Sequence, residues 1–452
     1  METKAAAPAV RPELPEEDER MDPISYLSVD AIGEIISLLP TKDAARTQTL
    51  SSRWRRLWRS APLNLDHRDL QWPRYDEEDL AGIISRILAS HPGPARRLSV
   101  PIVHLRRRPD TVDAWLRSPA LHGLRELEFD IGGLYEFAPD LPLPASAFRF
   151  SDTLVVTTFA KCRVPDGGGA LCFPQIRRLG LEDVVISEES LHGAIAGCPL
   201  LESLLLTGRS RFSCIRINSP TLVSLGLRVY TEELVIEDAP LLERLLQLEF
   251  RIATQLSVIS APKLETVDCL SDLDYYNKLT SQATELQELS ADSSVMVVGS
   301  VKNLSINIPS LSIDMFVDLM RCFPCLDKLY IQTRNVSGNK DLWHDDVIKS
   351  LDIRLKTVAL RTYIATWSQV NLATFFVLNA KMLELMICDG RHSGRRRFIK
   401  DQKTLLQLEK RASRGAQFHF TSSTCYHFLP RISHVRDLSK ADLFKCDSDC
   451  TF

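Results

Sequence analysis

The chain has 452 residues, of which 44% are hydrophobic and 25% are charged, and its formal net charge at pH 7 is −3. This composition is that of an ordinary globular protein and excludes a collagen-like or wholly disordered chain. The nearly balanced charge argues against a dedicated nucleic-acid-binding protein, because neutralising phosphates requires a concentrated basic excess.

Leucine accounts for 65 residues and glycine for only 19, which favours a repetitive apolar architecture over a glycine-rich cofactor-binding fold. No stretch approaches the ~20 apolar residues of a membrane span, and the first twenty residues lack the apolar region of a signal peptide. We therefore expect no membrane partner and a location in the cytosol, the nucleus or both. The 11 cysteines are then expected to be reduced and mostly buried.

Residues 1–20 are rich in Pro, Ala and Glu without apolar periodicity, which predicts a disordered tail. Three short helices are expected next, and the first has one apolar face and ends at Pro40. The apolar residues of that face are Ile32, Ile35, Ile36 and Leu39. Thr41 is expected to cap the second helix, and Ser51 to open the third. Three such helices bury little apolar area, so this unit needs a partner or a neighbouring domain.

Downstream, an apolar pattern of the form Pro-x-Leu-x-x-Leu-x-Leu recurs along the chain. Prolines at positions 199, 220, 240 and 262 repeat it with periods of 21, 20 and 22 residues. These periods are typical of leucine-rich repeats, in which each unit adds one short strand to a curved parallel sheet. The alternative is a chance run of leucine-rich strands in another α/β protein. The nearly constant spacing favours the α/β solenoid, whose stacked repeats share one core.

Residues 21–65 resemble the F-box, and the string LLPTKDAARTQTLSSRWRRLWRSAPLNLD (38–66) looks like that of plant F-box/leucine-rich-repeat proteins in particular. ISRILASHPGPARRLSV (84–100) resembles the junction between F-box and repeats in that family. FIKDQKTLLQLEKRASRGAQFHF (398–420) is similar to the FBD segment that closes many members. The predicted organisation is a tail at 1–20, an F-box at 21–65, a junction at 66–100, a solenoid at 101–360, an FBD-like cap at 361–420 and a C-terminal tail at 421–452.

By this resemblance the F-box binds a Skp-type adaptor, and through it a cullin. The positions that match adaptor-contacting or core residues of the motif are Ile24, Leu27, Ile32, Ile35, Leu39, Pro40, Leu50, Trp54 and Leu57. Sequence periodicity does not separate contact residues from core residues. The sequence departs from the motif at Ser28, where Pro is usual, and at Gly33, which costs a helix interior about 1 kcal/mol relative to Ala.

Catalytic and metal-binding motifs are not evident. The sequence lacks the GxGxxG and GxxxxGK[ST] nucleotide-binding strings, the HExxH zinc motif and the GxSxG nucleophile elbow. Cys322 and Cys325 form a C-x-x-C without a matching second pair, which favours a turn between repeats over a metal or redox site. We therefore expect no enzyme activity, no cofactor and no metal.

In a parallel-sheet solenoid the ridge leucines point inward, and the residues between them line the concave face. This face begins acidic and becomes mixed, which suits a protein or peptide partner better than a polyanion. For any single residue, a solvated face without a ligand is the alternative. The candidate substrate-binding residues are Glu126, Glu128, Arg178, Leu205, Arg228, Arg244, Asp268, Lys328 and Tyr330.

The resemblance thus implies a non-enzymatic substrate-recognition subunit of a cullin-type (SCF) ubiquitin ligase. Its F-box would bind the adaptor, and its repeats would bind a protein substrate that no motif identifies. The alternative is a leucine-rich-repeat scaffold or ligand sensor whose degenerate F-box does not bind the adaptor.

Overall fold

The computed structural model describes residues 26–70, 77–131, 141–166, 171–247, 255–271, 298–311, 313–336, 353–390, 396–421, 432 and 434–439. The predicted tail at 1–20 and the candidate residue Ile24 lie outside this part of the chain.

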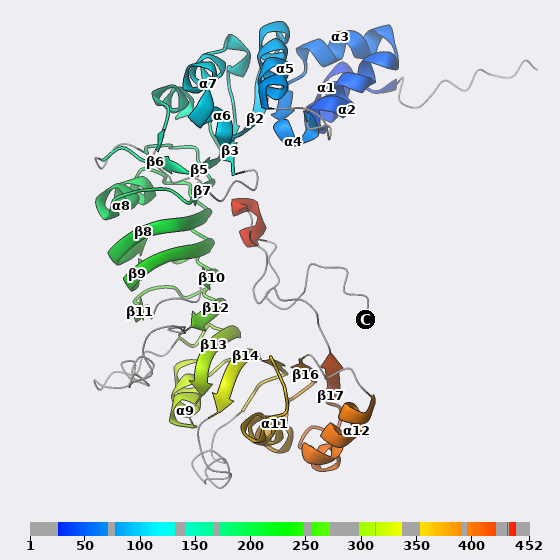
Figure 1. The fold of residues 1–452 in the computed structure, drawn as a ribbon, viewed down its shortest axis with the longest axis vertical. Coiled ribbons are helices and arrows are strands. Elements are labelled where there is room, and N and C mark those ends of the chain that lie inside the picture. Colours follow the sequence, from blue (N-terminus) through cyan, green and yellow to red (C-terminus); the bar gives the residue numbers. More distant parts are fainter. Residues whose placement is uncertain are drawn as a thin grey trace, which may run out of the picture.

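A small helical module begins the described chain (Figure 1). It consists of α1 (Val29–Leu38), α2 (Thr41–Arg46), the 3-10 helix η2 (Thr47–Thr49) and α3 (Ser52–Ser60). Ser28 caps α1 by accepting a hydrogen bond from the backbone N–H of Ala31 at 3.1 Å. Ser51 caps α3 in the same way, as predicted. Thr41 is not a cap but the first residue of α2, and its hydroxyl donates to the backbone carbonyl of Asn64.

One parallel sheet runs through the rest of the described chain, and its strands follow one another in space nearly as they do in sequence. The strands on this path are β1 (Leu63–Asp66), β2 (Ala95–Pro101), β3 (Glu126–Asp130), β5 (Val156–Ala160), β7 (Arg178–Glu182), β8 (Ser203–Asn218), β9 (Ser224–Asp238), β10 (Arg244–Gln247), β12 (Thr266–Ser271), β13 (Asn303–Leu311), β14 (Lys328–Val336), β15 (Thr357–Arg361), β16 (Leu385–Asp389) and β17 (Gln417–Thr421). β11 (Gln255–Val258) pairs with β9 beside the path, and β4 (Leu141–Pro142) pairs with β6 (Cys162–Arg163) in a separate small sheet.

The strands form an arc, and α8, α9 and α11 lie along its outer side (Figure 1). The 3-10 helix η7, drawn in red, lies on the inner side of the arc. The helices that follow the N-terminal module are α4 (His67–Leu70), α5 (Glu77–Ser90), α6 (Ile102–Arg107), α7 (Pro109–Leu116), η3 (Pro119–Leu121), η4 (Ala145–Phe150), α8 (Glu188–Ala196), α9 (Ile313–Cys322), α11 (Trp367–Asn379), α12 (Arg396–Leu405), η6 (Leu408–Lys410) and η7 (Val435–Ser439).

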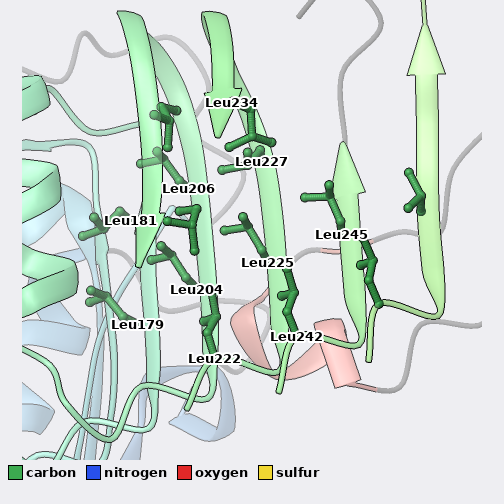
Figure 2. Close-up of a cluster of buried hydrophobic side chains, with 14 of the residues drawn as sticks. Leu179, Leu181, Leu204, Leu206, Leu222, Leu225, Leu227, Leu234, Leu242 and Leu245 are labelled. Atoms are coloured by element: carbon green, nitrogen blue, oxygen red, sulfur yellow. The ribbon is translucent and has the colours of Figure 1, made fainter. Parts of the chain in front are cut away.

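The repeated leucines stack into ladders inside the solenoid. Leu179, Leu204, Leu225 and Leu245 pair in register across four neighbouring strands. All four side chains are buried, and Figure 2 shows them pointing the same way from successive strands. No single repeat could bury such a ridge, so the stacking itself makes the core. The predicted α/β fold, a helical module followed by a curved parallel sheet, is confirmed.

The sheet extends beyond the interval 101–360 that was predicted for the solenoid. β1 already pairs with β2, although these strands lie in the stretches predicted as F-box and junction. β16 and β17 continue the sheet through the stretch predicted as a cap. These outer units lack the regular proline spacing, but their backbone hydrogen bonds continue the same ladder.

Candidate functional site

Exposed apolar side chains on the helical module form the first candidate contact surface. The large ones among the described residues are Tyr26 (72% exposed), Val29 (55%), Ile35 (40%), Leu38 (60%) and Leu50 (63%). Ile35 and Leu38 are three residues apart in α1, so they are neighbours on the helix surface. A module this small has too few residues to cover all its apolar area, which leaves these side chains accessible to a partner.

The interior of the module is a separate cluster made of Ile32, Ile36, Ala44, Trp54 and Ala61. The side chain of Trp54 is 9% exposed, and that of Ile32 is 0% exposed. The sequence alone left open whether these two residues contact an adaptor or build the core. The structure places both in the core, so they support the module's shape rather than its accessible surface.

The other candidate residues of the module divide in the same way. Leu27, Leu39 and Leu57 are partly buried against the interior cluster, whereas Pro40 is exposed. Sequence reasoning missed the exposed Leu38, whose signal was its spacing of three residues from Ile35 along α1.

Polar contacts fix the helical module against the first strands of the sheet. The guanidinium of Arg96 in β2 lies 3.5 Å from a carboxylate oxygen of Glu34 in α1. The His91 ring meets the Trp58 ring edge-on, with the ring centroids 5.2 Å apart. The side-chain amide of Asn64 in β1 donates to the backbone carbonyl that follows α1. The module therefore sits directly on the end of the solenoid and not on a separate linker.

The concave face of the sheet is the second candidate surface. Its strand register aligns residues of alternate positions into rows that cross the sheet. The first row contains Arg97, Glu126, Val156, Arg178, Ser203, Ser224 and Arg244. The second row contains Ser99, Glu128, Thr158, Gly180, Leu205, Gly226 and Leu246.

Carboxylates and arginines are paired at the N-terminal end of this face. Glu128 accepts hydrogen bonds from Arg97 at 2.6 Å and from Arg68 at 3.2 Å, and Arg97 also donates to Glu126 at 3.2 Å. Burial acts to raise the pKa of Asp66, but hydrogen bonds and charge from Arg68, with the charge of Arg97, leave that pKa below its ordinary value. Asp66 therefore stays ionised at neutral pH and helps to hold both arginines in place.

Glu182, at the end of β7, differs from these paired carboxylates. Its enclosed Oε1 atom has no hydrogen-bond partner among the described residues. Burial raises the pKa of Glu182 to about 8, and the charges of Glu128 and Asp130 act in the same direction. Glu182 is therefore mostly protonated at neutral pH.

A segment near the C-terminal end of the chain packs on this face. Its three apolar side chains form a cluster, separate from the main core, with three apolar side chains of the sheet. The members of the cluster are Ile432, Val435 and Leu438 from the segment, and Val156, Leu205 and Leu246 from the sheet. This segment belongs to the interval 421–452, which was predicted as a tail. It is docked because its apolar residues find unpaired apolar partners on the concave face.

Polar contacts accompany this apolar cluster. The guanidinium of Arg436 donates to the carboxylate of Glu126. Arg228 and Arg244 donate to the backbone carbonyls at the two ends of the segment, each at 3.4 Å. Arg228 and Arg244 therefore hold the backbone of the segment, whereas Glu126 binds one of its side chains, that of Arg436.

His434 adds a further contact through both ring nitrogens. Its Nδ1 accepts the backbone N–H of Arg436 at 3.1 Å, so Nε2 carries the proton when the ring is neutral. Nε2 lies 3.1 Å from the hydroxyl oxygen of Thr158 and 3.8 Å from a carboxylate oxygen of Glu128. Burial lowers the pKa of His434, although the charge of Glu128 opposes this effect.

The structure separates the predicted substrate-binding residues into three groups. Those that contact the docked segment are Glu126, Glu128, Leu205, Arg228 and Arg244. Arg178 is half-buried in the first row, and Lys328 is exposed further along the sheet. Asp268 and Tyr330 do not line an accessible surface, since only 2% and 7% of their surfaces are exposed. Asp268 is paired with Leu246, so it continues the second row on the concave face, as simple alternation predicts, although its side chain is enclosed there.

Sequence reasoning missed Val156 and Leu246 on this face. A signal for Leu246 was present, because Leu245 and Leu246 are adjacent and two successive residues of a strand face opposite sides. The run Leu204–Leu206 has the same property and leaves Leu205 facing outward. Consecutive leucines in a strand therefore mark an apolar patch on the concave face.

A metal site among the described residues would require several ligating side chains close together. No cluster of three or more His, Cys, Asp or Glu that could hold a metal ion occurs in these ranges. Cys322 is buried and Cys325 is exposed, and both are free thiols. Burial raises the pKa of Cys162 to about 12 and that of Cys198 to about 11, so both stay protonated at neutral pH. Across the same ranges, no helix has the length and apolarity to span a bilayer.

Two protein-family models match the chain. The F-box domain model matches residues 24–66. A model of the leucine-rich repeats of FBD-associated F-box protein At5g56370 matches residues 112–331.

Several curated proteins of Arabidopsis thaliana are similar to the chain. F-box/FBD/LRR-repeat protein At2g04230 is 28% identical over 279 residues, covering 59% of this chain and 57% of that protein. FBD-associated F-box protein At5g56370 is 34% identical over 194 residues, covering 41% of this chain and 44% of that protein. Putative F-box/FBD/LRR-repeat protein At5g56810 is 25% identical over 395 residues, covering 80% and 88%. The chain thus spans about half the length of the first two of these relatives.

Proposed function

We propose, from the premise that this chain carries an F-box domain joined to leucine-rich repeats of the FBD-associated F-box type, that it is the substrate-recognition subunit of an SCF-type ubiquitin ligase. The F-box would bind a Skp-type adaptor and through it a cullin, while the repeats would bind a protein substrate. The observation that carries the proposal is that one chain presents two separate contact surfaces, the exposed apolar side chains of the F-box and the concave face of the sheet.

In this proposal the chain acts by proximity and not by chemistry of its own. The conjugating enzyme, brought by the adaptor and cullin, meets substrate lysines at a high effective concentration. That effect requires a defined distance between the two surfaces. The contacts of Arg96 with Glu34 and of His91 with Trp58 support it, because they hold the F-box against the first strands.

The exposed residues Ile35, Leu38 and Leu50 are the proposed adaptor contacts. Large apolar side chains at the centre of an interface often dominate its binding energy. Trp54 and Ile32 would contribute indirectly, since they form the interior of the F-box. The cap that Ser28 provides also supports adaptor binding, because it stabilises the first turn of α1 in the absence of the usual proline.

The test is titration of a Skp-type adaptor with the full chain, with Ile35→Glu and with Trp54→Ala, while circular dichroism follows folding. Ile35→Glu should lower the affinity by roughly thirtyfold, which corresponds to about 2 kcal/mol, without changing the melting temperature. Trp54→Ala should lower both the affinity and the melting temperature, because removal of a buried tryptophan side chain lowers the free energy of unfolding by about 3–5 kcal/mol. Leu405→Glu is the matched control, since Leu405 is an exposed leucine of α12.

The second candidate function is a leucine-rich-repeat scaffold or ligand sensor that does not bind an adaptor. Gly33 inside α1 favours it, since glycine weakens the helix that carries Ile35 and Leu38. Absence of adaptor binding by the correctly folded full chain would support the scaffold and reject the ligase proposal.

A further inference from the structure

The concave face has the features of a peptide-binding site, and a short segment of the same chain fills it. We propose that the face from β3 to β10 recognises a peptide in which apolar residues at intervals of three surround an arginine, and that Ile432 and residues 434–439 occupy this site in cis. The inference deepens the proposed function. It rests on that function for the statement that the recognised peptide belongs to the substrate.

The apolar part of the site is an exception on a mainly polar face. Leu205 and Leu246 stand in the second row with Gly226 between them, and Gly180 precedes Leu205. A Cβ atom at Gly180 would lie 2.8 Å from the hydroxyl oxygen of Thr158, so no larger residue fits there without displacing Thr158. Leu205 is therefore flanked in its row by two residues without side chains, and the Thr158 side chain fills the space beside Gly180.

The spacing of the segment matches this surface. Ile432 is 5% exposed, and Val435 and Leu438 are 0% exposed, so all three side chains are buried on docking. Val435 and Leu438 lie three residues apart in the 3-10 helix η7, which places them on one side of it, and Ile432 precedes the helix at the same spacing in the sequence. A peptide of another spacing could not present all three to the same patch.

The polar part of the site adds selectivity for charge. Glu126 accepts from Arg436 and from Arg97, so an acidic side chain of the ligand would be repelled at this position. Arg228 and Arg244 donate to backbone carbonyls, which every peptide carries. Arg436 and the spacing of the apolar residues therefore define the ligand. Arg228 and Arg244 of the sheet add affinity without selecting for a sequence.

Covalent connection gives the segment an advantage over any separate ligand. Ten residues, 422–431, join the end of β17 to Ile432. A ligand on so short a connection has an effective concentration on the order of millimolar. A partner peptide therefore binds well only if its affinity is high enough to displace the segment, or if the segment is released.

The first experiment compares two full-length chains, the wild type and the double variant Val435→Asp/Leu438→Asp. The probe is a fluorescent synthetic peptide with the sequence of residues 430–441. The double variant should bind the probe at least about tenfold more tightly than the wild type, because its own segment no longer competes. Equal affinity for both chains, or no binding by the folded variant, would overturn the proposal and leave the segment as a structural closure only.

The second experiment tests the assigned contact by exchanging charges. A probe carrying Arg436→Glu should bind the double variant at least about tenfold more weakly than the original probe. Adding Glu126→Arg to the chain should restore binding of the altered probe and weaken that of the original. Failure of this exchange would remove Glu126 from the site.

Hydrogen exchange on the full chain covers the case in which the double variant does not fold. Arg436→Glu should raise amide exchange in residues 434–438 without affecting the repeats, and Glu126→Arg should restore protection in that background. Unchanged exchange in the single variant contradicts the inference. None of these measurements involves an adaptor, so a chain that binds the probe but no adaptor would keep this inference while the ligase proposal fails.

Discussion

The guanidinium of Arg436 is hydrogen-bonded to the carboxylate of Glu126, although 310 residues separate them in the sequence. The contact joins η7, which follows β17 along the chain, to β3, the third strand on the path of the sheet. Glu126 also accepts from Arg97, so one carboxylate links β2, β3 and η7. The segment at the C-terminal end of the described chain is therefore joined to the N-terminal part of the sheet.

Truncation of one buried side chain should release the docked segment. We predict that Leu438→Ala raises the rate at which trypsin cleaves after Arg436 by roughly thirtyfold. Leu438 is fully buried, and loss of a buried leucine side chain costs about 2 kcal/mol or more. When opening and closing are faster than cleavage, the cleavage rate follows the population of the open form.

Mass spectrometry of the digestion products measures this rate. Leu405→Ala serves as the control, because it removes an exposed leucine of α12, which lies apart from η7 (Figure 1), and should leave cleavage at Arg436 unchanged. Identical cleavage rates in Leu438→Ala and the wild type would show that the apolar cluster does not hold the segment.

Glu182 should make the stability of the chain depend on pH in a defined direction. Its pKa is raised by burial to about 8 from an ordinary value of 4.5, so the folded chain keeps a proton that the unfolded chain releases. The stability contributed by this group is present below pH 4.5 and is lost as the pH rises to about 8. Glu182→Gln removes this dependence.

We therefore expect the melting temperature of Glu182→Gln to exceed that of the wild type by more at pH 8 than at pH 5. Thermal unfolding at both values measures the difference. Glu243→Gln, at an exposed position on the turn before β10, should show no such trend. A wild-type advantage that grows with pH would mean that Glu182 is ionised and paired in the folded chain.

The sequence predicts the repeat core well because its signal is local and periodic. Leu204, Leu225 and Leu245 follow prolines at nearly constant distance, and each lies in the buried ladder that this spacing indicates. The outward position of Leu205 follows from simple alternation along the strand. The position of Asp268 opposite Leu246 on the same face follows in the same way, but its burial does not, because alternation gives the face of a residue and not what covers it.

The contact surfaces are less accessible to sequence reasoning. An apolar helix position such as Trp54 looks the same whether it faces the interior or a partner, and only the packing of three helices decides. Docking of Val435 and Leu438 depends on a match with Leu205 and Leu246, more than 180 residues earlier by their numbering. No local pattern records such a match.

Two glycines that both have free space around them should respond oppositely to alanine. No atom lies within 4 Å of a Cβ built at Gly33 or at Gly123, but Gly123 has a φ of +72°. Gly33→Ala should stabilise α1 by about 0.5–1 kcal/mol, because alanine is the better helix former. Gly123→Ala should destabilise the chain by about 1–2 kcal/mol, because a Cβ is strained at positive φ. Urea unfolding measures both, and the same sign for both would contradict the assigned backbone conformations.

Ser28 should determine whether α1 is in place for adaptor binding. Its hydroxyl accepts the N–H of Ala31 at 3.1 Å, and loss of such a cap costs about 1 kcal/mol. Ser28→Ala should therefore destabilise the F-box by that amount and weaken adaptor binding by severalfold. Ser28→Asp should preserve both, because a carboxylate caps the helix and also interacts favourably with its N-terminus. Thermal unfolding and adaptor titration of the two variants separate the roles. If Ser28→Ala lowers stability without changing affinity, the start of α1 lies outside the adaptor contact.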